Sequence, residues 1–168
     1  MHKNRVVEHG AKDDVTMRSG SLWQAMPAPR GSLLMCLVVP VRNEALVLAS
    51  TLASIAAQRT LQGTPFDLAR VEVLVLANNC TDDSASIAQA FAQDNPAIAV
   101  LVEEVQLPAA QAHIGHVRRL LMDGACQRLE RFGSGGFVVS TDADTVVDPY
   151  WLASMLPRSS SQPDQRDE

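Results

Sequence analysis

The amino-acid sequence predicts an α/β fold in which a mostly parallel sheet carries helices on both of its faces. Four apolar runs of strand length alternate with segments of helical character, and parallel strands need such crossovers between them. The runs are continuously apolar, which is typical of strands buried on both faces. Polar loops follow three of the four runs. We expect these loops to converge at the carboxyl edge of the sheet, where parallel sheets bind ligands.

The first strand is predicted over residues 33–41, LLMCLVVPV, an unbroken apolar run rich in branched side chains. Pro40 breaks the strand. Asn43 is expected to cap the following helix, since an asparagine side chain can accept hydrogen bonds from free backbone amides. Apolar residues recur at helical spacing in the segment EALVLASTLASIAAQ, at Leu48, Leu52 and Ile55.

The strand and helix unit then recurs along the chain. Residues 71–77 form a second apolar run, and the loop NNCTD leads from it into the helical segment SASIAQAFAQ. A third run, residues 97–102, precedes a helix that is expected to end at a glycine-rich turn, GSGG. The apolar residues of that helix are Val117, Leu120, Leu121 and Leu129. The fourth strand, residues 137–140, is followed by the loop TDADT and a short helix, YWLASML, that stops before Pro157.

One compact domain is expected to span residues 32–156. A chain of 168 residues is within the usual range for a single domain and can bury a substantial core. Residues 1–31 are polar, show no sustained periodicity and are predicted to form a flexible leader. Residues 157–168 are also polar and are predicted to form a disordered tail.

Composition limits the classes of function. The formal net charge of -5 provides no general attraction to nucleic acid or to an anionic membrane surface. The 3 cysteines are widely spaced and suggest neither a disulfide framework nor a zinc site, which fits a reducing compartment. The first residues lack a secretory signal, and no apolar run approaches the roughly 20 residues that span a bilayer. We therefore expect a soluble cytoplasmic protein with no nucleic-acid partner and no membrane span.

Asp142 and Asp144 form the most prominent candidate site. Residues i and i+2 of an extended segment point to the same side, so the two carboxylates can share a divalent cation. Magnesium and manganese prefer hard oxygen ligands and leave positions open for phosphate oxygens. The two aspartates could instead cap the helix that begins near Asp148, and their spacing alone favours that alternative.

Three motifs in order resemble the family 2 glycosyltransferases. PVRNEA, LVLANNCTDDS and VVSTDADTVVDPYW correspond to the family's P-x-x-N-E start, its D-D-G-S or N-N-C-T-D loop and its D-x-D motif. The resemblance covers residues 33–156. It implies a GT-A fold, a UDP- or GDP-sugar donor, and a Mn²⁺ or Mg²⁺ ion held by Asp142 and Asp144. It also implies transfer of the sugar to an acceptor hydroxyl, usually with inversion, while the metal stabilises the departing diphosphate.

The resemblance assigns donor contacts to further positions. Glu44 is similar to the acidic residue that contacts the uracil or ribose, although a glutamate in a first helical turn is also common because it complements the helix dipole. Pro40 and Val41 are expected to shape the base pocket. Asn78 takes the place of the first aspartate in the D-D-G-S version and is expected to contact the base edge, which leaves the base itself open. Two loop residues are expected to cap the next helix rather than to bind a ligand: Thr81 and Asp82.

Arg118 and Arg119 lie in HIGHVRRLLMDGA, which resembles the family's glycine- and arginine-containing helix before D-x-D. These basic residues are expected to approach the donor diphosphate or sugar, and a solvated helix face is the alternative of equal weight. His113 and His116 have a spacing that a metal pair could use, but the sequence offers no third ligand nearby.

No general base for the acceptor hydroxyl is predicted. The family carries this carboxylate well beyond D-x-D, and the residues after Trp151 offer only Asp164, Asp167 and Glu168 in the polar tail. The chain is therefore expected to be a truncated donor-binding half whose transferase activity is weak or absent unless another chain completes it, and a dimer or a completing chain is the expected protein partner. The alternative is a non-catalytic remnant that binds nucleotide or nothing. A sugar-1-phosphate nucleotidyltransferase would need a glycine-rich phosphate loop, which PVRNEA lacks.

Overall fold

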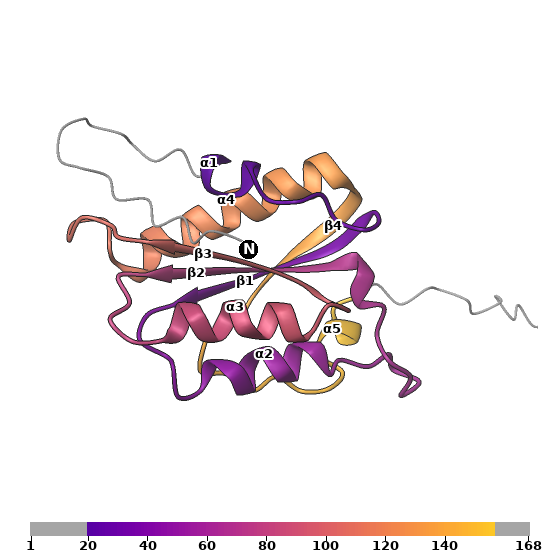
Figure 1. Ribbon diagram of the computed structural model, residues 1–168. Coiled ribbons are helices and arrows are strands. Elements are labelled where there is room, and N and C mark those ends of the chain that lie inside the picture. Colours follow the sequence, from indigo (N-terminus) through magenta and orange to yellow (C-terminus); the bar gives the residue numbers. More distant parts are fainter. Residues whose placement is uncertain (1–19, 157–168) are drawn as a thin grey trace, which may run out of the picture.

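The computed structural model describes residues 20–156, and these residues form a four-stranded parallel sheet with helices on both faces (Figure 1). The predicted α/β fold is thereby confirmed. The strands are β1 (Leu33–Val41), β2 (Val71–Asn78), β3 (Ala99–Val105) and β4 (Gly133–Ser140). The helices are α1 (Gly20–Gln24), α2 (Leu48–Ala56), the short 3-10 helix η1 (Leu68–Arg70), α3 (Ser84–Asp94), α4 (Ile114–Phe132) and α5 (Trp151–Ser154).

The helices divide into two layers. Helices α2, α3 and α5 cover one face of the sheet, while α4 and α1 cover the other (Figure 1). Alternate residues of each strand face opposite layers, so Leu37 and Val39 of β1 pack under α2, whereas Cys36 and Val38 pack under α4. All residues of β1 except the partly buried Leu34 are buried, which explains why its sequence is continuously apolar. Within the described residues, no helix is both long and apolar enough to cross a bilayer.

The strand order β3-β2-β1-β4 creates a switch point in the sheet. The chain moves from β1 to β2 and then to β3 in one direction, and it returns to the opposite side of β1 to form β4. The loops after β1 and β4 consequently lead away from each other and leave a crevice between the carboxyl ends of these two strands. Open α/β sheets bind ligands at such a crevice.

The glycine-rich segment differs from its prediction as a turn. Helix α4 runs directly into β4, and residues 133–136 are the first part of that strand. A Cβ atom on Gly133 would lie 2.6 Å from the carbonyl oxygen of Leu129, and one on Gly136 would lie 2.7 Å from that of Leu34. The glycines therefore allow close backbone approach where helix and strand join, and the β1–β4 register shifts at this place.

The predicted capping role of Asn43 is also wrong. Helix α2 begins only at Leu48, and its N-cap residue, Val47, makes no side-chain capping bond. Asn43 has a φ of 59°, a left-handed conformation that asparagine tolerates. Its side-chain oxygen accepts a hydrogen bond of 2.7 Å from the backbone N–H of Thr81. Asn43 thus joins the loops after β1 and β2 instead of starting a helix.

The region predicted as a flexible leader contains a packed helix. Trp23 in α1 is only 2% exposed and lies on Gly124 of α4, where an added Cβ would come within 2.1 Å of its ring. The prediction missed this contact because a single buried tryptophan produces no periodic pattern. Residues 1–19 and the predicted tail, 157–168, lie outside the described residues.

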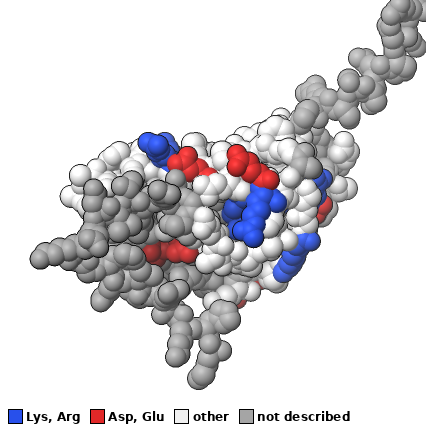
Figure 2. Space-filling model, turned by 90° about the horizontal axis from the view of Figure 1, so that it is seen from above, with Lys and Arg blue, Asp and Glu red and all other residues white. Residues whose placement is uncertain are grey.

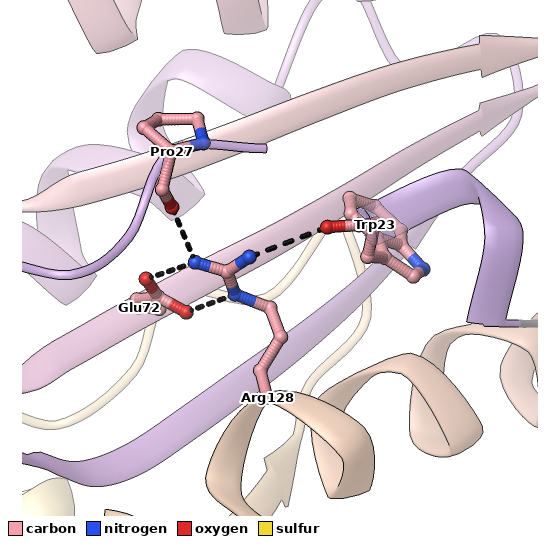
Figure 3. Close-up of polar contacts among 4 residues, drawn as sticks. All are labelled: Trp23, Pro27, Glu72 and Arg128. Carbon is pink, nitrogen blue, oxygen red and sulfur yellow. Dashed lines mark hydrogen bonds and ion pairs between the residues drawn. The ribbon is translucent and has the colours of Figure 1, made fainter. Parts of the chain in front are cut away.

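A buried ion pair fastens the segment after α1 to the sheet (Figure 3). Glu72 of β2 and Arg128 of α4 are 1% and 4% exposed at their side chains. The guanidinium donates to both carboxylate oxygens at 2.5 and 2.7 Å, and it also donates to the carbonyls of Trp23 at 3.3 Å and Pro27 at 2.7 Å. One arginine therefore links β2, α4 and the N-terminal segment.

Candidate functional site

A hollow of about 290 Å³ lies at the carboxyl ends of the strands, beside the switch point between β1 and β4. Its walls come from the ends of β1 and β2, the loop after β4, and the segment that leads into α4. The residues that line it are Pro40, Val41, Arg42, Glu44, Asn78, Ala112, His113, Ile114, Asp142, Ala143 and Asp144. The structure thus brings together six of the eight donor and metal residues that were predicted from the sequence.

Hydrogen bonds between two loops build one wall of the hollow. The backbone N–H of Glu44 donates to the hydroxyl of Ser84 at 2.8 Å, and that of Ala45 donates to the carboxylate of Asp82 at 3.0 Å. Asp82 also accepts from the backbone N–H of Ser84 at 3.1 Å, so it holds the first turn of α3 as predicted. Thr81 instead contacts Asn43.

The Asp82 carboxylate makes this loop contact sensitive to acid. The hydrogen bond from the Ser84 hydroxyl is the main reason why the pKa of Asp82 lies below its ordinary value. A lowered carboxylate pKa stabilises the fold above the ordinary pKa of the group, and this contribution is lost as the pH falls through the folded-state value. The hydrogen bond from the backbone N–H of Ala45 to Asp82 is therefore expected to weaken in acid.

Asp142 and Asp144 reach the hollow from the loop after β4. Both are exposed, whereas Ala143 between them is 3% exposed and faces the core. The alternative in which the pair caps the next helix is wrong, because Asp148 accepts the backbone N–H of Tyr150 at 2.8 Å just before α5. The two carboxylates are thus not used as helix caps.

Thr51 of α2 fixes the D-A-D loop, residues 142–144, from the core side. Its hydroxyl is fully buried and donates to the carbonyl of Ala143 at 2.7 Å. We expect Thr51→Val to lower the free energy of unfolding by about 1–3 kcal/mol, because the buried carbonyl loses its donor. Denaturant unfolding measures this change. Thr64→Val removes an exposed hydroxyl contact and is the matched control, with an expected change within about 0.5 kcal/mol. Equal effects of the two substitutions would contradict the role of Thr51.

The two arginines that were predicted to contact the donor, Arg118 and Arg119, lie in different surroundings. Arg118 forms an ion pair with Asp142 at the edge of the hollow. Arg119 is 79% exposed, does not line the hollow, and pairs with Asp123 one helical turn further along α4. Figure 2 shows the face over α4, where blue and red side chains lie next to each other. The solvated-face alternative thus describes Arg119, and only Arg118 is placed near the two aspartates.

Asn78 and Glu44, which were predicted to contact the base edge and the uracil or ribose, both line the hollow. Asn78 is 3% exposed and lines the hollow, and its side-chain Nδ2 is buried without a hydrogen-bond partner among the described residues. A buried amide donor without a partner is costly, and a ligand acceptor would satisfy it. The neighbouring Cys80 is buried as well, and burial raises the pKa of its thiol, so it is not an activated nucleophile.

Sequence reasoning missed part of the lining. Arg42 belongs to the PVRNEA motif and could have been included on that basis, whereas Ala112 and Ile114 carry no local signal. In the structure the Arg42 guanidinium donates to the carbonyl of Ala112 at 3.0 Å and so joins two walls. His113 caps α4, since its Nδ1 accepts from the backbone N–H of His116 at 3.2 Å. This capping role accounts for His113 without a metal.

The two aspartates fit a divalent cation in their chemistry. They offer exposed carboxylate oxygens at the edge of one hollow, and among the described residues Asp144 makes only a long contact of 3.5 Å with the neighbouring Thr145 hydroxyl. Within residues 20–156 there is no group of three or more acidic, histidine or cysteine side chains that could enclose a metal. A cation held by these two carboxylates would thus complete its coordination with water and ligand oxygens, as magnesium does at phosphate sites.

Comparisons with known proteins identify a protein family and solved structures with a similar fold. The model of the family described as "Glycosyl transferase family 2" matches residues 36–165. The crystal structure of S. aureus TarS 1-349 is similar with a TM-score of 0.55 and 20% identity, over 73% of this chain and 31% of that chain. The same protein in complex with UDP-GlcNAc gives a TM-score of 0.51 and 20% identity, over 73% and 30%. A search among curated proteins found no match.

Proposed function

This chain belongs to glycosyl transferase family 2, and we propose that it binds a nucleotide-diphosphate sugar together with a divalent cation for transfer of the sugar to an acceptor hydroxyl. The family model spans most of the chain, and the similar solved structures share its GT-A fold, as predicted. The observation that carries the proposal is the position of the hollow. It lies at the switch point of the sheet and combines two exposed carboxylates with a buried, unpartnered amide.

Six of the lining residues have a chemical part in the proposal. Pro40 and Val41 form an apolar wall for the base. Asn78 offers an amide to the base edge, and Glu44 offers a carboxylate to a ribose hydroxyl. Asp142 and Asp144 would hold a Mn²⁺ or Mg²⁺ ion, which supplies electrostatic stabilisation to the departing diphosphate when it is bound. The described residues thus provide a donor site.

Acceptor activation is not assigned to a residue of this chain. The chain spans about 31% of the TarS 1-349 structure, so the activity of a whole family member is a proposal here. The polar tail contains three carboxylates that were not expected to act as a general base: Asp164, Asp167 and Glu168. They lie outside the described residues. The second candidate function, in which the chain binds donor nucleotide without transferring the sugar, stays a prediction.

Two further expectations from the sequence belong to the proposal. A cytoplasmic location is consistent with the three free thiols. A completing chain would supply acceptor-side residues, but neither the comparisons nor the described residues support the dimer that was expected as a possible partner.

The proposal is tested by calorimetric titration of the chain with UDP and with GDP, in the presence and absence of Mn²⁺. We expect one of the nucleotides to bind at least about 10-fold more tightly with Mn²⁺, since the cation joins the carboxylates to the diphosphate. Uridine and guanosine are the controls, because they lack the diphosphate and gain nothing from the metal. Binding that ignores Mn²⁺, or no binding of either nucleotide, would contradict the donor site.

A further inference from the structure

Arg118 holds one of the two carboxylates that the proposed function assigns to the metal. It lies in the first part of α4, and its terminal nitrogen pairs with Oδ1 of Asp142. Both side chains are about half exposed, at 41% and 56%. The Nε atom of Arg118 is buried and has no hydrogen-bond partner among the described residues. This guanidinium therefore has donor capacity that the contact with Asp142 does not use.

The charges around the hollow explain why the contact between Arg118 and Asp142 matters for ligand binding. Glu44, Asp142 and Asp144 contribute three carboxylates to the lining, and Arg42 contributes one guanidinium. Without Arg118 the lining has an excess of two negative charges, which would repel a diphosphate. Arg118 and a divalent cation are thus two positive partners for the same carboxylate, and they compete for Asp142 when no donor is present.

We propose that Arg118 is the resident counter-cation of Asp142, that a divalent cation displaces it, and that the released guanidinium then binds the diphosphate of the donor. This inference rests on the proposed function. A guanidinium is suited to both positions, because its planar set of five N–H donors pairs with carboxylates and phosphates alike. The exchange keeps Asp142 paired before the metal arrives and adds a positive charge to the diphosphate afterwards.

The exchange predicts effects of opposite sign. Removing Arg118 frees Asp142, so Mn²⁺ alone binds more tightly. The same removal takes a cation from the diphosphate, so UDP or GDP binds less tightly at saturating Mn²⁺. A residue that only supported the shape of the site would weaken both binding steps when replaced.

The test measures Mn²⁺ binding without nucleotide, by calorimetry or by the EPR signal of free Mn²⁺, for wild type and Arg118→Gln. We expect Mn²⁺ to bind about 3- to 10-fold more tightly to Arg118→Gln, as a half-exposed ion pair is lost. At saturating Mn²⁺ we expect the nucleotide to bind at least about 10-fold more weakly, as one charged hydrogen-bond donor is lost. Arg119→Gln is the matched control, because Arg119 is its neighbour on α4 and pairs with Asp123 outside the hollow.

Arg118→Lys provides a second, independent reading, because lysine keeps the positive charge but lacks the planar donor set. Its Mn²⁺ affinity should stay within about 2-fold of wild type, while its nucleotide affinity falls. Thermal unfolding verifies that each variant is folded. Unchanged or weaker Mn²⁺ binding in Arg118→Gln, with Mn²⁺-dependent nucleotide binding intact in wild type, overturns the exchange and leaves the proposed function standing. Absence of Mn²⁺ binding in both proteins overturns the exchange, whereas the proposed function is overturned only if nucleotide binding by wild type is independent of Mn²⁺.

Discussion

Replacing Glu72 by alanine is expected to lower the free energy of unfolding by about 3–5 kcal/mol, because it leaves the buried Arg128 guanidinium without its counter-charge. Domains of this size are stable by only about 5–15 kcal/mol, so the loss would remove a large part of the total. Arg128 also holds the carbonyls of Trp23 and Pro27, and the variant should consequently release the segment that contains α1 (Figure 3). Denaturant unfolding followed by circular dichroism measures the change in free energy.

Two further variants separate the ion pair from a general effect of truncation. Glu130→Ala removes an exposed glutamate from α4, two residues beyond Arg128, and should change stability by no more than about 0.5 kcal/mol. Glu72→Leu combined with Arg128→Met replaces both charges by apolar groups. It should recover much of the loss, since removing a whole buried pair is often nearly neutral. If Glu72→Ala lowered the free energy of unfolding by less than about 1 kcal/mol, the ion pair would contribute little to stability.

This ion pair also marks a limit of prediction from sequence. Glu72 lies in an apolar run that identified β2 correctly, and a charge within such a run gives no indication of its partner. Arg128 is 56 residues away in sequence and belongs to another layer of the fold. The contact with α1 depends in turn on this arginine and on Gly124 beneath Trp23. The packed helix in the predicted leader could therefore be identified only from the structure and not from the sequence.

The sheet was predictable because its signals are local and repeated. Each strand contains an apolar run, and each polar loop at a carboxyl end introduced residues that the parallel sheet then brought to one edge. That rule placed Glu44, Asn78 and Asp144 together. It could not place Ala112 or Ile114, which reach the hollow from the segment after β3 and have no chemical signature of their own.

Predicting the role of the D-A-D loop needed both the local spacing of its residues and the family resemblance. Local spacing favoured helix capping, whereas the family resemblance favoured a metal site. The structure removes the capping alternative because Asp148, and neither of the two aspartates, accepts the backbone N–H of Tyr150 before α5, and because Thr51 holds Ala143 from the core side. Both outer carboxylates are then left at the surface of the hollow, and their function becomes a question for experiment.

Replacing Asp144 by alanine is expected to reduce Mn²⁺-dependent nucleotide binding to the level measured without metal. Loss of a residue that merely supports a metal ligand costs about 10- to 100-fold in metal affinity, so loss of a ligand itself should cost about 100-fold or more. Asp144 is the more sensitive of the two aspartates to test, because Asp142 is already paired with Arg118. Calorimetric titration with UDP and GDP at saturating Mn²⁺ measures the effect.

The control for Asp144 must remove the same charge from another place. Asp94 is an exposed aspartate at the end of α3, and Asp94→Ala should leave nucleotide affinity within about 2-fold of wild type. Because Asp144 is exposed and accepts no backbone hydrogen bond among the described contacts, its replacement should change the free energy of unfolding by less than about 0.5 kcal/mol. Lost binding with unchanged stability would therefore identify a ligand, whereas unchanged Mn²⁺-dependent binding would remove Asp144 from the metal site and leave Asp142 without the partner on which a shared cation depends.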